Sequence, residues 1–500
     1  MQVHLLYSDC DYDPAGTLSA QDQAVCEDLE LEALAAAMAG DDEFQLAAIR
    51  PLFYRSLLQP EAIRYRQEIL RDSLAHAAWV RELYALAVAG LENKAGRRYM
   101  IFGHSPEMLL EGAVRELNGL LPILASLHEL AGEALPMMKA PGWQAFFSML
   151  QTELSTKYLA EVQKLLQKLK FPQGILVRTH LGAELKAHSY VMCDRPAAPM
   201  QSWLWKLCSW FRPTAGFRIT IAERDESGHR ILSELRNAAM AQTAETVAAC
   251  RDQVRSFFSA LRMELAFYMG CLRLADRLAA QGIPFVFPVL ENSRNFSCQG
   301  LMNITLALHQ ERRPAVNTIA AGKNPLVLIT GANQGGKTTF LRSLGQACVM
   351  MACGMFVAAQ VFRAGPGRVF THFRREEDQQ LQSGKFDEEL QRMSGLIDSI
   401  HAGDLLLMNE SFAATNEREG SEIALGILQA LYESGVRVIF VTHFYTLTHA
   451  LQQRGDSRIL FLRADRQADG TRTFSLHPGE PLATAFGQDI YRRVFHLTEE

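Results

Sequence analysis

The chain has 500 residues, of which 48% are hydrophobic and 21% charged, and its formal net charge is −5. This composition excludes disordered and fibrous proteins and predicts roughly two to four globular domains. No apolar run reaches the roughly 18 residues of a membrane span, and the N-terminus lacks a secretory signal. Nine cysteines, an odd number without a Cys-x-x-Cys pair, argue against a disulfide framework. We therefore expect a cytoplasmic protein with no membrane partner, whose charge neither favours nor excludes nucleic acid.

The first half of the chain is predicted to be mostly helical. Helical periodicity covers residues 61–95, 106–133 and 143–170, and short apolar runs predict strands at 175–182 and 217–224. Between these strands, APMQSWLWKLCSWFRPTAG contains three of the five tryptophans together with Lys206 and Arg212. Interleaved aromatic and basic residues are typical of nucleic-acid contacts, whereas a tryptophan cluster is also typical of a core or a protein interface. Both interpretations stay open.

Residues 231–282 contain no proline, and their apolar residues recur every three or four positions. One unbroken helix there would span roughly 75 Å, as expected for a lever, whereas a kinked pair of core helices is the alternative. After residue 284, short apolar runs alternate with helices, which is typical of a parallel α/β sheet. We therefore expect a mostly helical core at 1–230, a long lever helix at 231–285 and an α/β P-loop NTPase domain at 286–500.

The segment LVLITGANQGGKTTFLRSLG, residues 326–345, carries the strongest motif. It is typical of a buried strand, a glycine-rich loop and the start of a helix, and it satisfies the P-loop pattern. Backbone N–H groups of such a loop surround the phosphates, Lys337 adds a positive charge, and the Thr338 hydroxyl is an oxygen ligand for Mg²⁺. The sequence thus predicts ATP and Mg²⁺ binding by Gly331, Ala332, Asn333, Gln334, Gly335, Gly336, Lys337, Thr338 and Thr339.

The run Asp404-Leu-Leu-Leu-Met-Asn409-Glu410 predicts a buried strand that ends in two polar residues, as in a Walker B segment. Glu410 is the candidate base that orients the attacking water, and a strand-end carboxylate without that role is the alternative. Asn409 stands where an Asp is usual. It can bind a magnesium-bound water but adds no negative charge, which predicts weaker metal retention and slower hydrolysis. Asp404 cannot replace it, because five strand residues separate the two by about 16 Å.

The next apolar strand, residues 436–441, is followed by Thr442 and His443. Ligands of open parallel sheets collect at the carboxyl edge of the strands, where His443 is expected to lie with Glu410. His443 is thus a candidate sensor of the γ-phosphate, and a purely local hydrogen-bonding role is the alternative. No spacing predicts a metal site beyond nucleotide-bound Mg²⁺.

These motifs resemble the MutS-type ATPases of DNA mismatch repair over residues 286–500, in the order GANQGGKTTFLRS, GMFVAAQ, LLLMNESFAATNEREG, VTHF and FSLHPGEPLATAFGQDIYRRVF. Upstream, EAIRYRQEILRD and FFSALRMELAFYMGC resemble the core and lever of that family. The resemblance implies a homodimer whose levers carry the nucleotide state to a DNA-binding clamp. It assigns residues 331–338 to the phosphate loop, Asn409 and Glu410 to the Walker B pair, the loop around Thr415 to the dimer partner, and His443 to the switch histidine.

The chain departs from the family pattern in three places. No Phe-x-Glu wedge for reading mismatches precedes the helical core, which argues against classical mismatch recognition. Residues 381–389 read Leu-Gln-Ser-Gly-Lys-Phe-Asp-Glu-Glu where the family has a Ser-Thr-Phe segment, so that Ser383 or Lys385 would take its place in the partner's site. The third departure is Asn409. From the roughly 60 residues after His443 we expect a strand pair and a terminal helix but no appended nuclease domain.

The leading hypothesis is a dimeric, slowly hydrolysing ATPase that binds DNA, duplex or branched, in repair or recombination, together with a possible repair partner protein. The alternative is a nucleotide-gated dimeric scaffold that binds a protein instead of DNA. A transporter-type ATPase is disfavoured, because it would need Leu-Ser-Gly-Gly-Gln where residues 381–385 read Leu-Gln-Ser-Gly-Lys.

Overall fold

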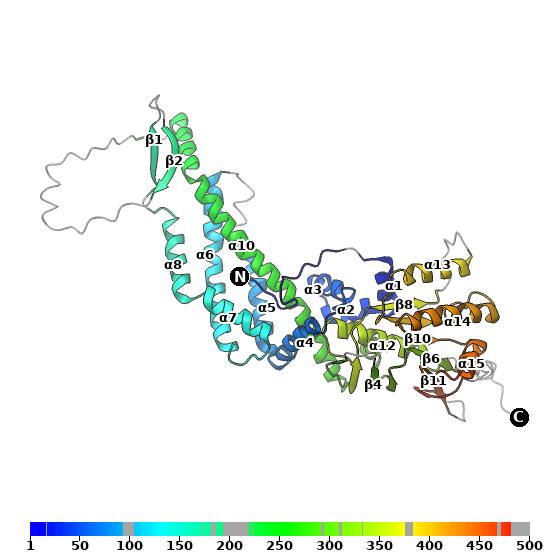
Figure 1. The fold of residues 1–500 in the computed structure, drawn as a ribbon. Helices are drawn as coiled ribbons and strands as arrows, with labels where there is room; N and C mark the ends of the chain where they lie inside the picture. The colour runs from blue at the N-terminus through cyan, green and yellow to red at the C-terminus, as the bar shows by residue number, and fades with distance from the viewer. Residues whose placement is uncertain are drawn as a thin grey trace, which may run out of the picture. The chain divides into compact units, whose positions relative to one another are not determined.

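The computed structural model describes residues 1–500 except 17, 94–104, 173, 182–186, 194–219, 223, 292–294, 310–312, 333, 376–383, 468–471 and 482–500. Its elements are shown in Figure 1. The chain packs as two compact units. The first comprises Met1, Ala85–Met137 and Phe147–Arg262, and the second comprises Gln2–Tyr84, Met138–Phe146 and Met263–Glu500. The domain boundaries expected at residues 230 and 285 stay a prediction.

The first unit is built from helices and one hairpin. Helix α6 (Pro106–Ala134) begins at Ser105, whose side chain accepts the Met108 N–H, and helix α8 (Thr156–Lys168) begins in the same way at Ser155. Such N-caps satisfy backbone donors that a helix leaves unpaired. Strands β1 (Leu176–Leu181) and β2 (Ala187–Cys193) pair antiparallel. The apolar core of this unit joins α6, α8 and α10 (Glu226–Ala280) through the buried residues Leu110, Val114, Leu166, Met240 and Ala244.

The structure corrects several expected element boundaries. The helix expected at 61–95 is two helices, α4 (Pro60–Ala75) and α5 (Ala77–Glu92), because His76 leaves the helical conformation at φ −126° and ψ 43°. The helix expected at 143–170 is likewise divided into α7 (Pro141–Glu153) and α8, with the cap Ser155 between them. Of the strand expected at 217–224, residues 220–222 and 224 are not in a strand, and residues 217–219 and 223 lie outside the described residues.

Helix α10 runs without a break from Glu226 to Ala280 over 55 residues. At 1.5 Å per residue its length is about 80 Å. The structure therefore contains one continuous helix here and not a pair. Its C-terminal half buries an apolar stripe that includes Phe257, Leu261, Leu265, Tyr268 and Leu272. No helix in the described ranges combines the length and apolar character that crossing a bilayer requires.

The second unit contains a six-stranded sheet in the order β12-β11-β6-β10-β9-β8. Strands β6, β8, β9, β10 and β11 are parallel, and β12 is antiparallel at the edge. Their bounds are β6 (Leu326–Gly331), β8 (Val369–Phe373), β9 (Leu405–Asn409), β10 (Arg437–Val441), β11 (Ile459–Arg466) and β12 (Arg472–Pro478). A second sheet has the order β3-β7-β4-β5, formed by β3 (Val289–Leu290), β4 (Phe296–Leu301), β5 (Asn317–Gly322) and β7 (Val361–Ala364). This mixture of helices and sheets agrees with the expected α/β class.

Helices cover both faces of the six-stranded sheet. One face packs against α13 (Lys385–Ile397), α14 (Glu417–Glu433) and α15 (Tyr445–Gln453), through residues such as Leu406, Met408 and Phe440. The other face meets α12 (Lys337–Ala352), where a side-chain carbon on Gly345 would come within 2.7 Å of Leu407. The remaining helices of this unit are α1 (Ala20–Asp28), α2 (Leu31–Ala39), α3 (Glu43–Ile49), the short 3-10 helix Arg50–Phe53, α4 and α11 (Ile304–His309).

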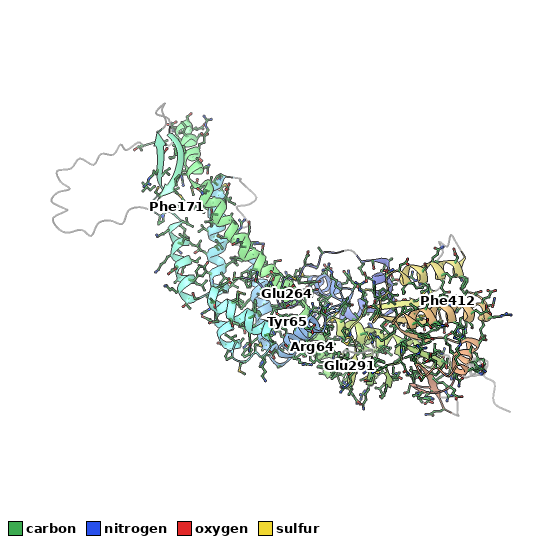
Figure 2. All side chains as sticks on the ribbon, in the orientation of Figure 1. Arg64, Tyr65, Phe171, Glu264, Glu291 and Phe412 are labelled. Carbon is green, nitrogen blue, oxygen red and sulfur yellow. The ribbon has the colours of Figure 1, made fainter. Side chains whose placement is uncertain are left out.

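The N-terminal segment of the second unit is held by one buried carboxylate (Figure 2). Glu264 on α10 accepts the backbone N–H groups of Leu5 (2.6 Å), Leu6 (2.8 Å) and Tyr12 (2.8 Å). Tyr65 adds a hydrogen bond to the carbonyl of His4 at 2.6 Å. Burial raises the pKa of Glu264 to about 7, although the three N–H donors favour the charged form. The attachment of residues 4–12 is therefore coupled to a proton near neutral pH.

We expect the folded chain to lose stability as the pH rises towards 7, because ionisation leaves a charge buried at Glu264. A carboxyl whose pKa is raised by folding contributes stability that is complete below its ordinary pKa of 4.5 and is lost as the pH passes 7. The loss corresponds to about 3 kcal/mol at most. The free energy of unfolding of the native chain, measured by denaturant titration, should fall between pH 5 and 8. Glu264→Gln should remove that pH dependence, and an unchanged dependence in this variant would contradict the assignment.

Candidate nucleotide site

The glycine-rich loop joins the buried strand β6 to helix α12. Its backbone takes positive φ at Gly331 (106°), Gln334 (59°) and Gly336 (84°), which is the region that favours glycine. A side-chain carbon on Gly335 would lie 2.8 Å from both the Ala332 carbonyl oxygen and the Ala464 Cβ on β11. The loop therefore has no room for a side chain on the face against β11. Asn333 lies outside the described residues, and Gln334 and Thr339 are exposed.

Lys337 is the first residue of α12 and is 8% exposed. Its Nζ donates hydrogen bonds to the carbonyl oxygens of Gly331 and Ala332, both at 2.9 Å. Burial lowers the pKa of Lys337, whereas the nearby Glu410 carboxylate raises it. An ammonium group is thus held inside the loop, where the loop offers it only neutral carbonyl partners. This arrangement fits a triphosphate, which would supply the missing negative charge.

Thr338 and Asn409, the two residues expected at the metal, are in contact. The Thr338 hydroxyl donates to the Asn409 side-chain oxygen at 3.1 Å. Asn409 ends β9, whose register pairs it with Val441 on β10 and with Phe373 on β8. The donor set fits a magnesium ion that keeps several waters, because both atoms are hard oxygens. Both are also neutral, so they would hold the ion less strongly than a carboxylate.

Glu410 follows β9 in the left-handed conformation, with φ 52°. Its N–H donates to the Val441 carbonyl at 2.8 Å, and its side chain is 35% exposed. The carboxylate lies 3.9 Å from the guanidinium of Arg374. The backbone N–H of Arg374 donates to the Asn409 carbonyl at 2.9 Å. Sequence reasoning missed Arg374. It follows β8 directly, so its position at the carboxyl edge of the parallel sheet was the available signal.

The backbone after Glu410 is held by buried polar contacts. Ser411 and the ring Nδ1 of His372 are 2.7 Å apart, and the His372 Nε2 lies 3.2 Å from the Glu389 carbonyl oxygen. Burial, together with the cation of Arg392, lowers the pKa of His372 to about 4. The ring is therefore neutral at physiological pH, and its Nε2–H can donate to the Glu389 carbonyl. The Ser411 hydroxyl also lies 2.7 Å from the His372 carbonyl oxygen, so its single hydrogen is shared between that oxygen and Nδ1.

Glu389 on α13 makes the second contact with this segment. Its Oε1 accepts the N–H of Phe412 at 2.6 Å, and burial raises the pKa of its carboxyl. Phe412 also has positive φ, 66°, and its ring is fully buried. Two non-glycine residues in the left-handed region are strained, and such strain persists only where neighbouring contacts impose it. Glu389 and His372 supply those contacts. Neither was predicted from the sequence.

His443 also lies beyond a strand of the sheet. Thr442, directly after β10, donates its N–H to the Ile329 carbonyl of β6 at 3.1 Å. His443 is exposed, and its ring packs edge-on against Phe444 with centroids 5.1 Å apart. The structure thus places His443 two residues after Val441, the last residue of β10. Among the described residues, no hydrogen bond or ion pair joins its side chain to Lys337 or Glu410.

The other sequence candidates are partly described. Asp404, 6% exposed, accepts the N–H groups of Arg368 and His401 at 2.9 Å, five residues before Asn409 on the opposite edge of the sheet. Thr415 donates to Glu419 at 2.8 Å in the loop before α14. Lys385 is the first residue of α13. Ser383 and the whole tryptophan-rich segment at 198–216 lie outside the described residues.

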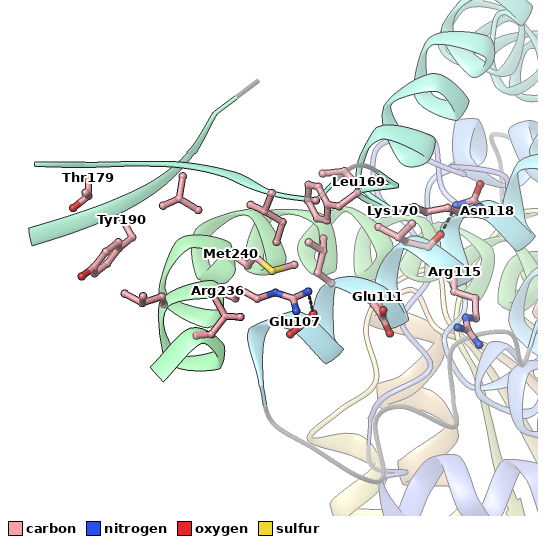
Figure 3. A pocket seen from close by; sticks show the side chains of 18 residues that line it. Glu107, Glu111, Arg115, Asn118, Leu169, Lys170, Thr179, Tyr190, Arg236 and Met240 are labelled. Carbon is pink, nitrogen blue, oxygen red and sulfur yellow. Dashed lines mark hydrogen bonds and ion pairs between the residues drawn. The ribbon is translucent and has the colours of Figure 1, made fainter. Parts of the chain in front are cut away.

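A cavity of about 840 Å³ lies within the first unit (Figure 3). Leu110, Val114 and Met240 contribute apolar side chains to its wall, and Arg236 forms an ion pair with Glu107 beside them. Leu232 (43% exposed) and Leu235 (37% exposed) lie along the same lining. Its lining includes no residue of the loop at 331–338. The cavity is therefore separate from the candidate nucleotide site.

Comparison with known proteins places both halves of the chain in one family. Residues 58–281 match the MutS2 N-terminal domain, and residues 327–483 match MutS domain V. The endonuclease MutS2 of Thermus thermophilus is 34% identical over 147 residues, which cover 29% of this chain and 20% of that protein. The DNA mismatch repair protein MutS of Haloquadratum walsbyi is 26% identical over 203 residues, which cover 38% and 22%.

A mammalian relative, MutS protein homolog 4 of Mus musculus, is 28% identical over 153 residues, 30% of this chain and 16% of that protein. The chain thus matches about a fifth of the length of these curated relatives. The second matching domain contains the loop at 331–338, Asn409, Glu410 and His443, and the first contains all of α10. The chain is a member of the MutS-type mismatch repair family.

Proposed function

We propose that this protein binds ATP with Mg²⁺ at residues 331–339, hydrolyses it slowly, and uses the nucleotide state to bind and release DNA as a homodimer in repair or recombination. The observation that supports nucleotide binding is the buried Lys337 ammonium inside the glycine loop, 2.9 Å from two loop carbonyl oxygens. The DNA half is supported by the names of the relatives, which are DNA mismatch repair proteins and an endonuclease.

The residues divide the chemistry among them. Lys337 and the loop N–H groups bind the phosphates, and Thr338 with Asn409 would hold Mg²⁺, which supplies charge compensation for the phosphates. Glu410 orients the attacking water as the base. Its ion-pair partner Arg374 lies 3.9 Å away. Slow turnover follows from the neutral Asn409, which would retain Mg²⁺ less strongly than a carboxylate.

The proposal has a direct test with the purified full chain. We expect Mg²⁺-dependent ATP binding, slow release of phosphate, and binding to duplex or branched DNA whose affinity changes with the nucleotide. Affinity should fall steeply with rising salt, because each phosphate contact releases counterions. Absence of binding to plain, branched and mismatched duplexes at low salt, with and without ATP, would remove the DNA half and leave the nucleotide half standing.

A nucleotide-gated scaffold is the second candidate. The apolar wall of the cavity in the first unit, with Leu232 and Leu235 exposed along it, favours a protein partner. The salt dependence of binding distinguishes the scaffold from the DNA-binding protein, because an apolar protein interface loses little affinity as the ionic strength rises.

A further inference from the structure

Lysine is unevenly distributed in this chain. Four of its 11 lysines, Lys157, Lys164, Lys168 and Lys170, fall within the 14 residues 157–170. All four side chains are exposed. An even distribution would place less than one lysine there, so the segment is locally basic although the whole chain carries a net charge of −5. A general need for solubility does not explain why four lysines are clustered within residues 157–170.

The helical geometry of α8 gathers three of these lysines on one face. At about 100° per residue, Lys157, Lys164 and Lys168 fall within about 40° of one another around the helix axis. Leu166, which is buried in the core of the first unit, lies roughly opposite this face, with the partly buried Val162 beside it. The core contact of α8 thus turns the three lysines outward. We call Lys157, Lys164 and Lys168 the lysine face.

The lysine face has the dimensions of a phosphate-binding surface. From Lys157 to Lys168 it extends about 16 Å along the helix axis, and each strand of a duplex presents one phosphate per about 3.4 Å of its axis. Tyr158, 52% exposed, stands next to it, and its hydroxyl is a type of donor that contacts phosphates. Glu161 also points to this side and reduces the formal charge of the face from +3 to +2.

We propose that the lysine face of α8 binds the phosphate backbone of duplex DNA, without reading its sequence. This inference rests on the proposed DNA-binding function and assigns it a surface. The contacts position the protein on DNA through charge, because lysine ammonium groups recognise phosphates as point charges. They lie outside the nucleotide site, so their removal should leave ATP binding unchanged.

The test measures DNA affinity against salt concentration with the full chain. Lys157→Gln combined with Lys164→Gln should reduce the slope of log K against log salt by about 1.8, which at 0.1 M salt is a loss of about 60-fold. The matched control combines Lys139→Gln with Lys323→Gln, which removes the same charge from two exposed lysines of the second unit. Its slope should stay that of the native chain. Glu161→Gln should change the affinity in the opposite direction and strengthen binding.

Three results would overturn the proposal. An equal slope in the lysine-face variant and the native chain would remove α8 from the DNA surface while leaving the proposed function intact. An equal loss in the control variant would show that only the net charge matters. A loss confined to duplex RNA, measured in a parallel titration, would assign the face to another nucleic acid. Failure of the native chain to bind DNA at all would instead remove the proposed function itself. Unchanged circular dichroism and ATP affinity establish that each variant is folded.

Discussion

Replacement of Glu410 by Gln is expected to lower the rate of ATP hydrolysis by at least about 100-fold while ATP affinity stays within a few-fold of the native value, because a positioned base contributes a factor of this size. The amide keeps the shape of the side chain but cannot accept a proton. The loop that would bind the phosphates is built on Lys337 and on backbone groups, and Glu410 acts on Lys337 only through its charge. Single-turnover hydrolysis and equilibrium ATP binding, measured on the same preparation, separate the two effects.

The matched control for Glu410→Gln is Lys337→Ala, which should abolish ATP binding itself. Asn409→Asp should act in the opposite direction, since a carboxylate beside Thr338 would retain Mg²⁺ more strongly than the amide oxygen now 3.1 Å from that hydroxyl. Equal hydrolysis rates in the native chain and Glu410→Gln would remove Glu410 as the base. A native chain that binds ATP but never turns it over would contradict the ATPase proposal.

Replacement of Glu389 by Ala is expected to slow hydrolysis by up to about 100-fold without a change in ATP affinity, because a displacement of about 1 Å at a catalytic group can have this effect. Glu389 accepts the N–H of Phe412, two residues after Glu410, at 2.6 Å. Without this acceptor the left-handed backbone at Glu410 and Phe412 loses one of the contacts that impose it. Glu389 is therefore expected to act by positioning Glu410.

The conservative variant distinguishes positioning from a loss of folding. Glu389→Gln keeps an oxygen that can accept the Phe412 N–H and should retain most of the activity. Glu388→Ala, at the neighbouring and less buried position of α13, should leave the rate unchanged. Equal losses in Glu389→Ala and Glu389→Gln would show that the negative charge, and not the hydrogen bond, is what matters. Thermal unfolding of all three variants shows whether α13 remains packed.

The elements around the nucleotide loop were predictable because each is continuous in the sequence. An apolar run, a glycine loop and a helix predict β6, the loop and α12 by local rules alone, and the same holds for β9 before Asn409 and β10 before His443. The long helix was predictable as well, because the absence of proline and a steady apolar period extend through α10. The breaks at His76 and Ser155 were missed, although Ser155 is a typical N-cap residue.

The contacts around Glu410 could not be predicted, because they join residues that are distant in the chain and follow no period. His372 contacts Ser411, which is 39 positions later in the chain, and Glu389 accepts a hydrogen bond from Phe412, which is 23 positions later. The anchoring of Leu5 by Glu264 spans 259 positions. Polar residues scattered in this way look like ordinary surface residues in the sequence. Only their burial in the folded chain shows that they have partners.

The sequence by itself therefore determined the nucleotide loop, the order of strands that lead to it and the family resemblance, since all three depend on short continuous motifs. The tertiary structure decided what surrounds Glu410, because the parallel sheet brings the ends of β8, β9 and β10 to one edge and places Arg374 beside the carboxylate. The tertiary structure also determined which lysines of α8 share one exposed face. The sequence shows four clustered lysines, but only the burial of Leu166 turns three of them together towards solvent.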